Sequence, residues 1–331
     1  MTDSVQEGLE RIAGRLAAGG TVSGLRQLTG GASQQTWSFD LVSSHGTEPL
    51  ILRQSGVFSG GGSEQNITLD VEAQLVERVA RGGVPVPRVR YVLEPGDGLG
   101  QGYIMQRVEG EALPQRILGD PAFDDVRPRL AEQCGEILGR IHRVVTDGLT
   151  GLRRATPEQE VARQLEEYRG HGPRRPVFEL ALRWLQDHVP PSRHLALVHG
   201  DFRNGNLLVG PDGIRAVLDW ELAYIGDPME DLGWLCVNSW RFGRDLPVGG
   251  FGTREALFAG YQRTSGERVD PDAVAFWEVY GSLKWGVICR MMAHSYRSGA
   301  DRSLEPAVIG RRASEAEIDL LHLLAPLDGG T

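Results

Sequence analysis

The feature that most constrains the fold of this chain is a set of polar residues beside two short apolar strand patterns, in 199-HGDFRNGN-206 and 217-VLDWE-221. Asp201 and Asn206 lie five residues apart, and Asp219 follows 13 residues later at the end of a predicted strand. Carboxylate and amide groups beside buried strands are unfavourable unless something pairs with them. Magnesium prefers oxygen ligands, so a metal ion together with a phosphate would be a suitable partner. The spacing predicts that one loop and the next strand end meet at a single site.

The acidic residues around this strand end support a bound cation. Asp219, Glu221, Asp227, Glu230 and Asp231 fall within one short segment that contains no basic residue. An isolated H-x-D or D-x-E pattern is most often a solvated loop. Crowded like charges near apolar strands, however, lower stability unless a cation offsets them.

The chain changes its hydrophobic pattern near residues 106–110. Before this point, strand patterns at 22–42, 49–55, 88–94 and 103–110 accompany helical patterns at 3–19 and 67–83. Beyond it, only two short strands, 206–209 and 214–220, lie among helical patterns at 121–146, 157–170, 174–189, 228–242, 253–266, 271–298 and 304–325. We therefore predict an α+β fold with a small antiparallel sheet and one key helix in residues 1–106, followed by a larger, mainly helical part in residues 107–331.

Composition excludes several classes of function. A net charge of −9 over 331 residues argues against a nucleic-acid partner, because phosphate backbones need a basic face. No run of about 18 apolar residues predicts a membrane span, and the N-terminal residues lack a signal-peptide layout. We therefore expect a cytoplasmic protein without a membrane partner. The three cysteines lack metal-ligand spacing and are predicted to be buried apolar residues.

The motif HGD-x4-N followed by LDWE resembles the aminoglycoside phosphotransferase family, whose fold is similar to that of protein kinases. The segment 103-YIMQRVEG-110 is similar to the family's interlobe hinge, and 226-GDPMEDLGWL-235 to the segment after its metal-binding aspartate. The segment 283–299 resembles the terminal helix of a subgroup related to domains fused to acyl-CoA dehydrogenases. The resemblance spans roughly residues 20–325. It implies a two-lobed, protein-kinase-like fold with a nucleotide-binding N-lobe, residues 1–106, and a C-lobe, residues 107–331, that carries the catalytic loop and the acceptor site.

This resemblance implies a role for each polar residue of the opening motif. Asp201 would be the catalytic base that orients and deprotonates an acceptor hydroxyl, and Asn206 and Asp219 would hold Mg²⁺. Arg203, at the place where kinases often have lysine, could stabilise the transferring phosphoryl group.

Supporting roles follow for neighbouring residues. His199 is expected to fix the loop by hydrogen bonds, and Asp227 and Asp231 resemble aspartates that brace the catalytic loop. Glu221 could approach the metal through water or could be structural. The tryptophans lie on helical patterns and are predicted to be core residues.

In the N-terminal part, Gly30, Gly31 and Ser33 resemble the turn that covers a nucleotide, although the kinase pattern G-x-G-x-x-G is absent and an ordinary hairpin is nearly as consistent with the local sequence. Arg53 occupies the position of the kinase lysine, and arginine can grip phosphate oxygens with two donors. Glu72, on the predicted helix, is the expected ion-pair partner of Arg53.

Backbone groups near Gln106 and Val108 would bind the adenine edge.

The implied enzyme is an ATP-dependent phosphotransferase, with GTP a weaker alternative, acting on a hydroxyl group of a small molecule. The acceptor could be an aminoglycoside-like antibiotic, or a hydroxyacyl or other metabolic substrate. The arginines that could meet an anionic acceptor, or could equally form a solvated helix face, are Arg290, Arg297, Arg311 and Arg312. A third possibility is a nucleotide-binding module without catalysis, which the presence of all three residues Asp201, Asn206 and Asp219 disfavours.

Overall fold

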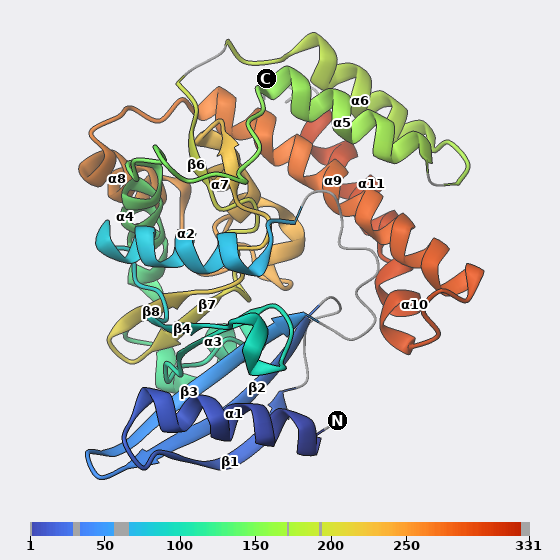
Figure 1. The fold of residues 1–331 in the computed structure, drawn as a ribbon. Helices are drawn as coiled ribbons and strands as arrows, with labels where there is room; N and C mark the ends of the chain where they lie inside the picture. The colour runs from blue at the N-terminus through green and yellow to red at the C-terminus, as the bar shows by residue number, and fades with distance from the viewer. Residues whose placement is uncertain (1, 29–33, 56–65, 171, 192–193, 326–331) are drawn as a thin grey trace.

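The computed structural model describes residues 2–28, 34–55, 66–170, 172–191 and 194–325 (Figure 1). Residues up to 106 contribute a five-stranded antiparallel sheet in the order β1-β2-β3-β5-β4. Its strands are β1 (Thr21–Leu28), β2 (Gln34–Ser43), β3 (Gly46–Ser55), β4 (Val89–Val92) and β5 (Gly102–Gln106). The central strands β2 and β3 pair without interruption, from Gln34 opposite Ser55 to Ser43 opposite Gly46. This pairing fixes the register of the sheet.

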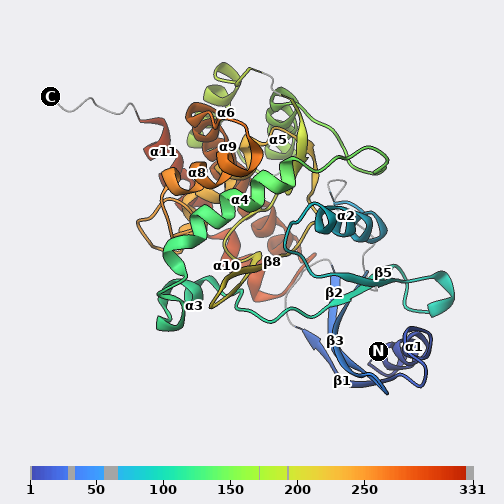
Figure 2. The same ribbon diagram turned by 90° about the vertical axis from the view of Figure 1, so that its left-hand side faces the viewer.

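Helices α1 (Thr2–Leu16) and α2 (Leu69–Arg81) cover opposite faces of this sheet (Figure 2). Successive residues of a strand point to opposite faces. Accordingly, Leu50 and Leu52 of β3 pack in the cluster that contains α1, whereas Ile51 packs in the cluster that contains α2. Arg53 lies two residues after Ile51 and therefore on the same face of β3, so its side chain is directed toward α2.

The remainder is mainly helical. Its core gathers around α4 (Leu130–His142), α7 (Met229–Cys236), α8 (Arg254–Ser265) and the long α9 (Pro271–Ser298). Two small antiparallel pairs lie within it, β6 (Ala196–Val198) with β9 (Tyr224–Gly226) and β7 (Leu207–Gly210) with β8 (Gly213–Val217). The other elements are α3 (Pro114–Gly119), α5 (Pro157–Gly170), α6 (Pro176–Asp187), α10 (Leu304–Gly310), α11 (Ala313–Leu324) and the 3-10 turns η1 (Pro95–Asp97), η2 (Pro121–Phe123), η3 (Arg127–Arg129) and η4 (Asn238–Arg241).

Helices α4 and α8 approach one another through glycines. A Cβ atom on Gly135 would overlap the carbonyl oxygen of Leu257, and one on Gly260 would overlap that of Glu132. Any side chain at either position would push the helices apart. This close contact matters for the site, because the two helices carry His142 and Tyr261.

The predicted α+β fold class is confirmed, and so are the helices at 157–170 and 271–298. Several details of the prediction were wrong. The helix predicted over 121–146 spans only Leu130–His142, because residues 121–129 form the turns η2 and η3. Strands β6 and β9 were missed, because three residues are too few to show a period of two. The helix predicted over 304–325 is two helices, since the chain turns at Gly310 so close to α9 that a Cβ there would lie 2.7 Å from Ala293 Cβ. The helix predicted over 228–242 ends at Cys236 and continues as η4.

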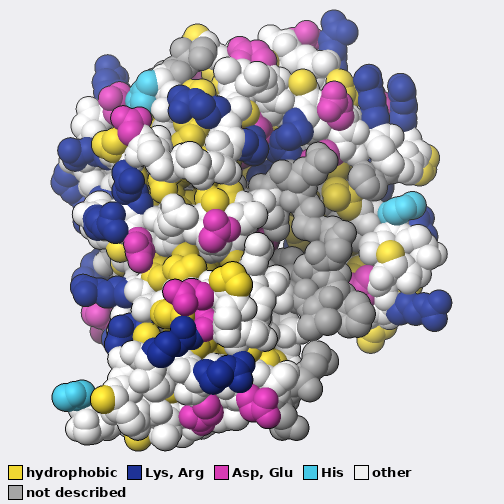
Figure 3. Space-filling view, in the orientation of Figure 1, with side chains coloured by type: hydrophobic (Ala, Val, Ile, Leu, Met, Phe, Trp, Pro, Cys, Tyr) yellow, Lys and Arg dark blue, Asp and Glu magenta, His cyan; other side chains and the backbone are white. Residues whose placement is uncertain are grey.

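The three cysteines are buried free thiols, in agreement with the prediction. No helix within the described ranges is long and apolar enough to cross a membrane. On the face shown in Figure 3, the arginine and carboxylate side chains of the described residues are interspersed rather than separated by sign.

Candidate active site

The loop His199–Asn206 joins β6 to β7, and Asp231 of α7 holds its first peptide groups. The backbone N–H groups of His199 and Gly200 donate to the two carboxylate oxygens of Asp231, at 2.8 and 3.0 Å. Gly200 has φ +78°, and a Cβ there would lie 2.5 Å from the carbonyl oxygen of Leu222. Only glycine fits this position without strain.

A buried chain of hydrogen bonds supports Asp231 from behind. His142 Nε2 lies 3.2 Å from Asp231 Oδ2, and His142 Nδ1 lies 3.0 Å from the Tyr261 hydroxyl. Burial alone would raise the pKa of Asp231, but His142 and the loop donors more than offset it and the pKa is lowered. Asp231 thus makes the contacts that a bracing role requires. Asp227, by contrast, accepts from the N–H of Met229 and from the Trp277 indole, so it fixes the start of α7 rather than the loop itself.

His199 ties this loop to the strand end that bears Asp219. Its Nε2 lies 3.0 Å from the carbonyl oxygen of Leu218, and its Nδ1 accepts from the N–H of Asp201 at 3.2 Å. Because Nδ1 accepts, Nε2 carries the proton and donates. Burial lowers the pKa of His199, which favours this neutral form. These are the contacts that a loop-fixing role requires.

The Asp201 carboxylate receives hydrogen bonds from three side chains. Oδ1 accepts from Trp234 Nε1 at 2.8 Å and from Arg203 Nε at 3.0 Å. Oδ2 accepts from Asn206 Nδ2 at 2.7 Å and, at 3.2 Å, from the same Arg203 nitrogen. The carboxylate is therefore held in one plane while 15% of its side chain stays accessible. Such an anchored, partly open carboxylate can orient a hydroxyl group.

Asn206 and Asp219 come together because the N–H of Leu218 donates to the carbonyl oxygen of Asn206 at 2.8 Å. The Asn206 amide nitrogen is committed to Asp201, so its Oδ1 is the atom that could bind a cation. Asp219 adopts φ +64°, which is uncommon for a residue other than glycine and is typical of constrained functional positions. Its side chain is 37% exposed and so can be reached by a ligand.

The chemistry of these donors fits Mg²⁺, since both offer oxygen. Among the described residues, no group of three or more His, Cys, Asp or Glu side chains is arranged to hold a metal ion. Magnesium usually takes one or two protein oxygens and completes its shell with water and phosphate, so a two-ligand site suits it only when a nucleotide supplies the rest.

Arg53 of β3 connects the N-terminal sheet to this cluster. Its Nη2 lies 3.4 Å from Glu72 Oε1 of α2 and 3.1 Å from Asp219 Oδ1. Its Nε and Nη2 also donate to Gln34 Oε1 at 3.0 and 2.7 Å. Burial would lower the pKa of Arg53, but Glu72 and the other neighbours outweigh it and the pKa is raised. The expected pairing of Arg53 with Glu72 is present.

Some predicted site residues lie elsewhere. Gly30, Gly31 and Ser33 fall outside the described residues. Glu221 accepts from Gln34 Nε2 at 3.1 Å, so it contacts the N-terminal sheet. The N–H of Gln106 donates to the carbonyl oxygen of Arg88 at 2.9 Å, so this N–H is already used within the protein.

The sequence analysis assigned no functional role to three residues of the site. Gln34 bridges Arg53 and Glu221, Trp234 donates to Asp201, and Lys284 reaches the carbonyl oxygen of Gly200 at 3.2 Å. Trp234 is 3% exposed and so is a core residue as predicted, yet its N–H serves the site. The one available hint was that Lys284 is the only lysine in the chain.

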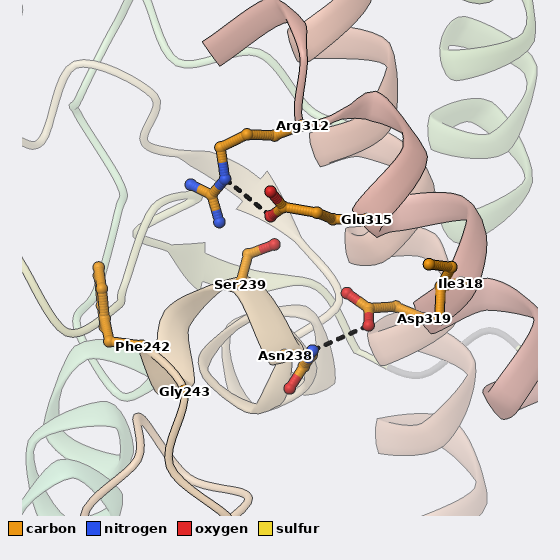
Figure 4. A pocket seen from close by; sticks show the side chains of 8 residues that line it. All are labelled: Asn238, Ser239, Phe242, Gly243, Arg312, Glu315, Ile318 and Asp319. Carbon is orange, nitrogen blue, oxygen red and sulfur yellow. Dashed lines mark hydrogen bonds and ion pairs between the residues drawn. The ribbon is translucent and has the colours of Figure 1, made fainter. Parts of the chain in front are cut away.

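A pocket of about 370 Å³ lies between η4 and α11 (Figure 4). A row of aromatic rings connects it to the site. Arg203 stacks over Trp240 at 4.6 Å, the Trp240 and Trp285 rings are 4.9 Å apart, and Arg312 lies 5.3 Å over Trp285. The pocket is lined by Asn238, Ser239, Phe242, Gly243, Arg312, Glu315, Ile318 and Asp319.

Glu230 of α7 is expected to make the protein's stability depend on pH. Burial raises the pKa of this carboxyl to about 7, against the opposing charge of Lys284 at 3.6 Å, while Glu160 raises it further and the Tyr224 hydroxyl donates to it. Because the folded pKa exceeds the unfolded value, the native protein retains a proton that the unfolded chain releases. This stabilisation is complete below the unfolded pKa and is lost as pH rises through the folded pKa.

Replacing Glu230 with glutamine removes the titration. From pH 5 to pH 8, the stability of Glu230→Gln relative to the unsubstituted protein should rise by about 1 kcal/mol per pH unit within the titration window. Denaturant unfolding at each pH measures it, with Glu77→Gln, on the exposed side of α2, as the control. Parallel pH profiles for Glu230→Gln and the unsubstituted protein would contradict this expectation.

Known structures share this architecture. A Ralstonia eutropha protein provisionally described as an aminoglycoside phosphotransferase is 22% identical, with a TM-score of 0.74 over 96% of this chain and 97% of its own. A choline/ethanolamine kinase family protein from Mesorhizobium loti is 18% identical, with a TM-score of 0.61 over 96% and 95%. An aminoglycoside phosphotransferase in complex with ADP and hygromycin B is 18% identical, with a TM-score of 0.63 over 98% and 100%. At these identities the likeness shows the fold, so the predicted kinase-like fold is confirmed.

The curated relatives are longer proteins. Acyl-CoA dehydrogenase family member 10 of Mus musculus is 30% identical over 180 residues, which are 51% of this chain and 16% of the relative. Acyl-CoA dehydrogenase family member 11 of Gallus gallus is 32% identical over 181 residues, which are 50% and 22% respectively. These matches span about a fifth of the relatives' length, and they agree with the subgroup resemblance of the sequence.

The family comparison covers both the sheet that carries Arg53 and the loops that carry Asp201, Asn206 and Asp219. The model of the phosphotransferase enzyme family matches residues 24–277, well over half of the chain. The protein thus belongs to the phosphotransferase enzyme family.

Proposed function

We propose that this protein transfers the γ-phosphoryl group of ATP, with GTP a weaker alternative, to a hydroxyl group of a small molecule. The observation that carries the proposal is the convergence of Arg53 and Asp219 at 3.1 Å, beside a loop in which Asn206 and Asp201 are joined at 2.7 Å. Residues 1–106 would form the nucleotide-binding lobe, and residues 107–331 the lobe with the catalytic loop and the acceptor site.

Each residue has a defined part in this proposal. Asp201 would accept the proton of the acceptor hydroxyl and orient that hydroxyl toward the phosphate. Asn206 Oδ1 and the Asp219 carboxylate would hold Mg²⁺, which when bound offsets negative charge on the phosphates. Arg53 would contact phosphate oxygens while Glu72 holds its guanidinium in place. Arg203 would stabilise the transferring phosphoryl group, after its guanidinium has released the Asp201 carboxylate.

The nucleotide would bind between the sheet and the loops. The turn with Gly30, Gly31 and Ser33 would cover the phosphates, and backbone groups of Gln106 and Val108 would bind the adenine edge. The N–H of Gln106 is used in a hydrogen bond to the Arg88 carbonyl, so the carbonyl of Gln106 is the backbone group proposed to meet the adenine.

The acceptor would enter the pocket of Figure 4. Of the four arginines proposed to meet an anionic group, Arg312 lines this pocket. The pocket carboxylates already have partners, Glu315 with Arg312 and Asp319 with Asn238, both at 2.8 Å. A polycationic antibiotic would compete with Arg312 and Asn238 for these carboxylates, and an anionic acceptor would compete with Glu315 for Arg312. The similarity to acyl-CoA dehydrogenase family members, rather than the charges of the pocket, favours a metabolic acceptor such as a hydroxyacyl compound over an aminoglycoside.

The acceptor is tested by incubating the protein with labelled ATP and magnesium against aminoglycosides, macrolides, choline-like alcohols and hydroxyacyl-CoAs. Transfer of label to an anionic alcohol is the expected result. Magnesium-dependent ATP binding without transfer to any acceptor or to water would instead favour the non-catalytic module.

Replacing Arg312 with alanine is expected to raise the KM for an anionic acceptor about tenfold while the KM for ATP stays unchanged. A hydrogen bond to a charged group contributes about 1.5–3 kcal/mol, which corresponds to at least this factor. Steady-state kinetics measure the effect, with Arg311→Ala on the exposed neighbouring position as the control. An equal KM in all three proteins would place the acceptor elsewhere.

A further inference from the structure

We propose that Trp234 and Lys284 are positioning residues that hold Asp201 for phosphoryl transfer; this rests on the role of Asp201 proposed above. Trp234 fixes the carboxylate of Asp201, and Lys284 fixes the peptide group just before it. Both residues lie in the helical part, on α7 and α9, and neither needs to touch a substrate.

Trp234 is a rigid and permanent donor to Asp201. Its indole N–H lies 2.8 Å from Asp201 Oδ1, and the residue is only 3% exposed. Its ring packs against α9 so closely that a Cβ on Gly281 would lie 2.9 Å from it, and Trp240 flanks it at 5.1 Å. An indole nitrogen donates and cannot accept, so Trp234 fixes the carboxylate without competing for the acceptor's proton.

Arg203 donates to the same carboxylate but is held less firmly. Its side chain is 25% exposed, and its guanidinium rests on the face of Trp240 rather than in the core. A nucleotide phosphate could therefore draw Arg203 away from Asp201. Trp234 would then remain, with Asn206, to keep the carboxylate in its plane.

Lys284 fixes the backbone on the other side. Its Nζ donates to the carbonyl oxygen of Gly200 at 3.2 Å and lies 4.7 Å from the Trp234 ring centre. The Oε1 of Glu230 lies 3.6 Å from the same Nζ. The Gly200 residue is thus held by its N–H through Asp231 and by its carbonyl through Lys284. Because Gly200 directly precedes Asp201, these two contacts together set the direction in which the Asp201 side chain projects from the backbone.

The consequence for catalysis is a specific kinetic pattern. In phosphoryl transfer the base mainly orients the nucleophile, so a loosened Asp201 should slow the chemical step. Nucleotide affinity depends on Arg53 and the sheet, which Trp234 does not contact in any described interaction. A fall in kcat with an unchanged Kd for ATP therefore marks positioning, whereas general loosening of the fold would affect both.

The test uses Trp234→Phe, which keeps an aromatic ring and removes the N–H. Transfer from labelled ATP is followed to water and to any acceptor that the panel provides. We expect kcat to fall at least tenfold and the Kd for ATP to change less than twofold. The matched control is Trp37→Phe in the sheet, where the indole nitrogen is buried and has no hydrogen-bond partner among the described residues. It should lose no activity, and the two variants should have similar Tm values.

Three further variants separate positioning from packing. Lys284→Met should lower kcat, and Lys284→Arg, which keeps a charged donor, should restore part of it. In an Asp201→Asn background, Trp234→Phe should cause little additional loss, because there is no carboxylate left to hold; a packing defect would instead multiply the two losses.

Full activity of Trp234→Phe alongside an inactive Asp201→Asn would overturn the positioning role and leave the proposed function intact. Full activity of Asp201→Asn, or no transfer by the unsubstituted protein to any acceptor or to water, would overturn the proposed function itself. The two failures are therefore distinguishable.

Discussion

Replacing Asp201 with asparagine is expected to lower phosphoryl transfer by about 10²–10⁴-fold while ADP still binds. The amide cannot take up the acceptor's proton. It also turns one oxygen into a donor that faces Trp234, Arg203 or Asn206, all of which already donate toward this position. The nucleotide contacts proposed for Arg53 and Asp219 are left in place, so binding and transfer should separate.

The measurement pairs initial rates of label transfer with ADP binding by calorimetry. Asp212→Asn is the matched control, because Asp212 lies in the turn between β7 and β8 with 70% of its side chain exposed and pairs only with the nearby Arg215 among the described salt bridges. Unchanged turnover in Asp201→Asn would remove Asp201 from the mechanism.

Replacing Arg53 with alanine is expected to weaken ATP binding by at least tenfold and to lower the free energy of unfolding by on the order of 3 kcal/mol. The stability loss arises because Glu72, which is 1% exposed, would lose its cation partner. Burial already raises the pKa of Glu72, so in the variant this carboxyl should take up a proton rather than remain a buried anion. Arg53→Lys should be partly tolerated, since it keeps the charge but cannot contact Gln34, Glu72 and Asp219 together.

A second substitution separates these two effects. In Arg53→Ala combined with Glu72→Gln, the unpaired charge is gone, so stability should recover in part while ATP affinity stays low. Denaturant unfolding and ATP titration are the two measurements. Arg90→Ala in the same sheet is the control, because its pair with Glu48 is exposed. Equal ATP affinity in the unsubstituted protein, in Arg53→Lys and in Arg53→Ala would show that Arg53 does not touch the phosphates.

Local spacing predicted which polar residues of the two loops meet, and the family resemblance supplied the roles expected of them. Asp201 and Asn206 share one loop, and Asp219 follows a strand that pairs back onto the strand after that loop, so a short segment brings all three together. The pairing of Arg53 with Glu72 was predicted from the resemblance to the kinase pattern, and the structure places the two side chains 3.4 Å apart because β3 directs Arg53 toward α2.

The short strands β6 and β9 were not predicted, although they determine where the loop begins. Three residues carry too little periodicity to be recognised, and the partners of β9 are distant in the sequence: β6 on one side and residues 153–155 on the other. The break between α10 and α11 likewise depends on the close approach of Gly310 to α9. Contacts of this kind join distant segments and leave no local pattern.

The sequence by itself determined the fold class, the family resemblance and the polar residues of the two loops, because each of these depends on residues close together in the chain. Only the tertiary structure decided which side chains hold Asp201. Trp234 and Lys284 lie 33 and 83 residues beyond Asp201 in the sequence, and no local spacing links either of them to the loop. Their effect comes from the packing of α7 and α9 against the loop, which places one indole N–H and one ammonium group within hydrogen-bond distance of the base and its backbone.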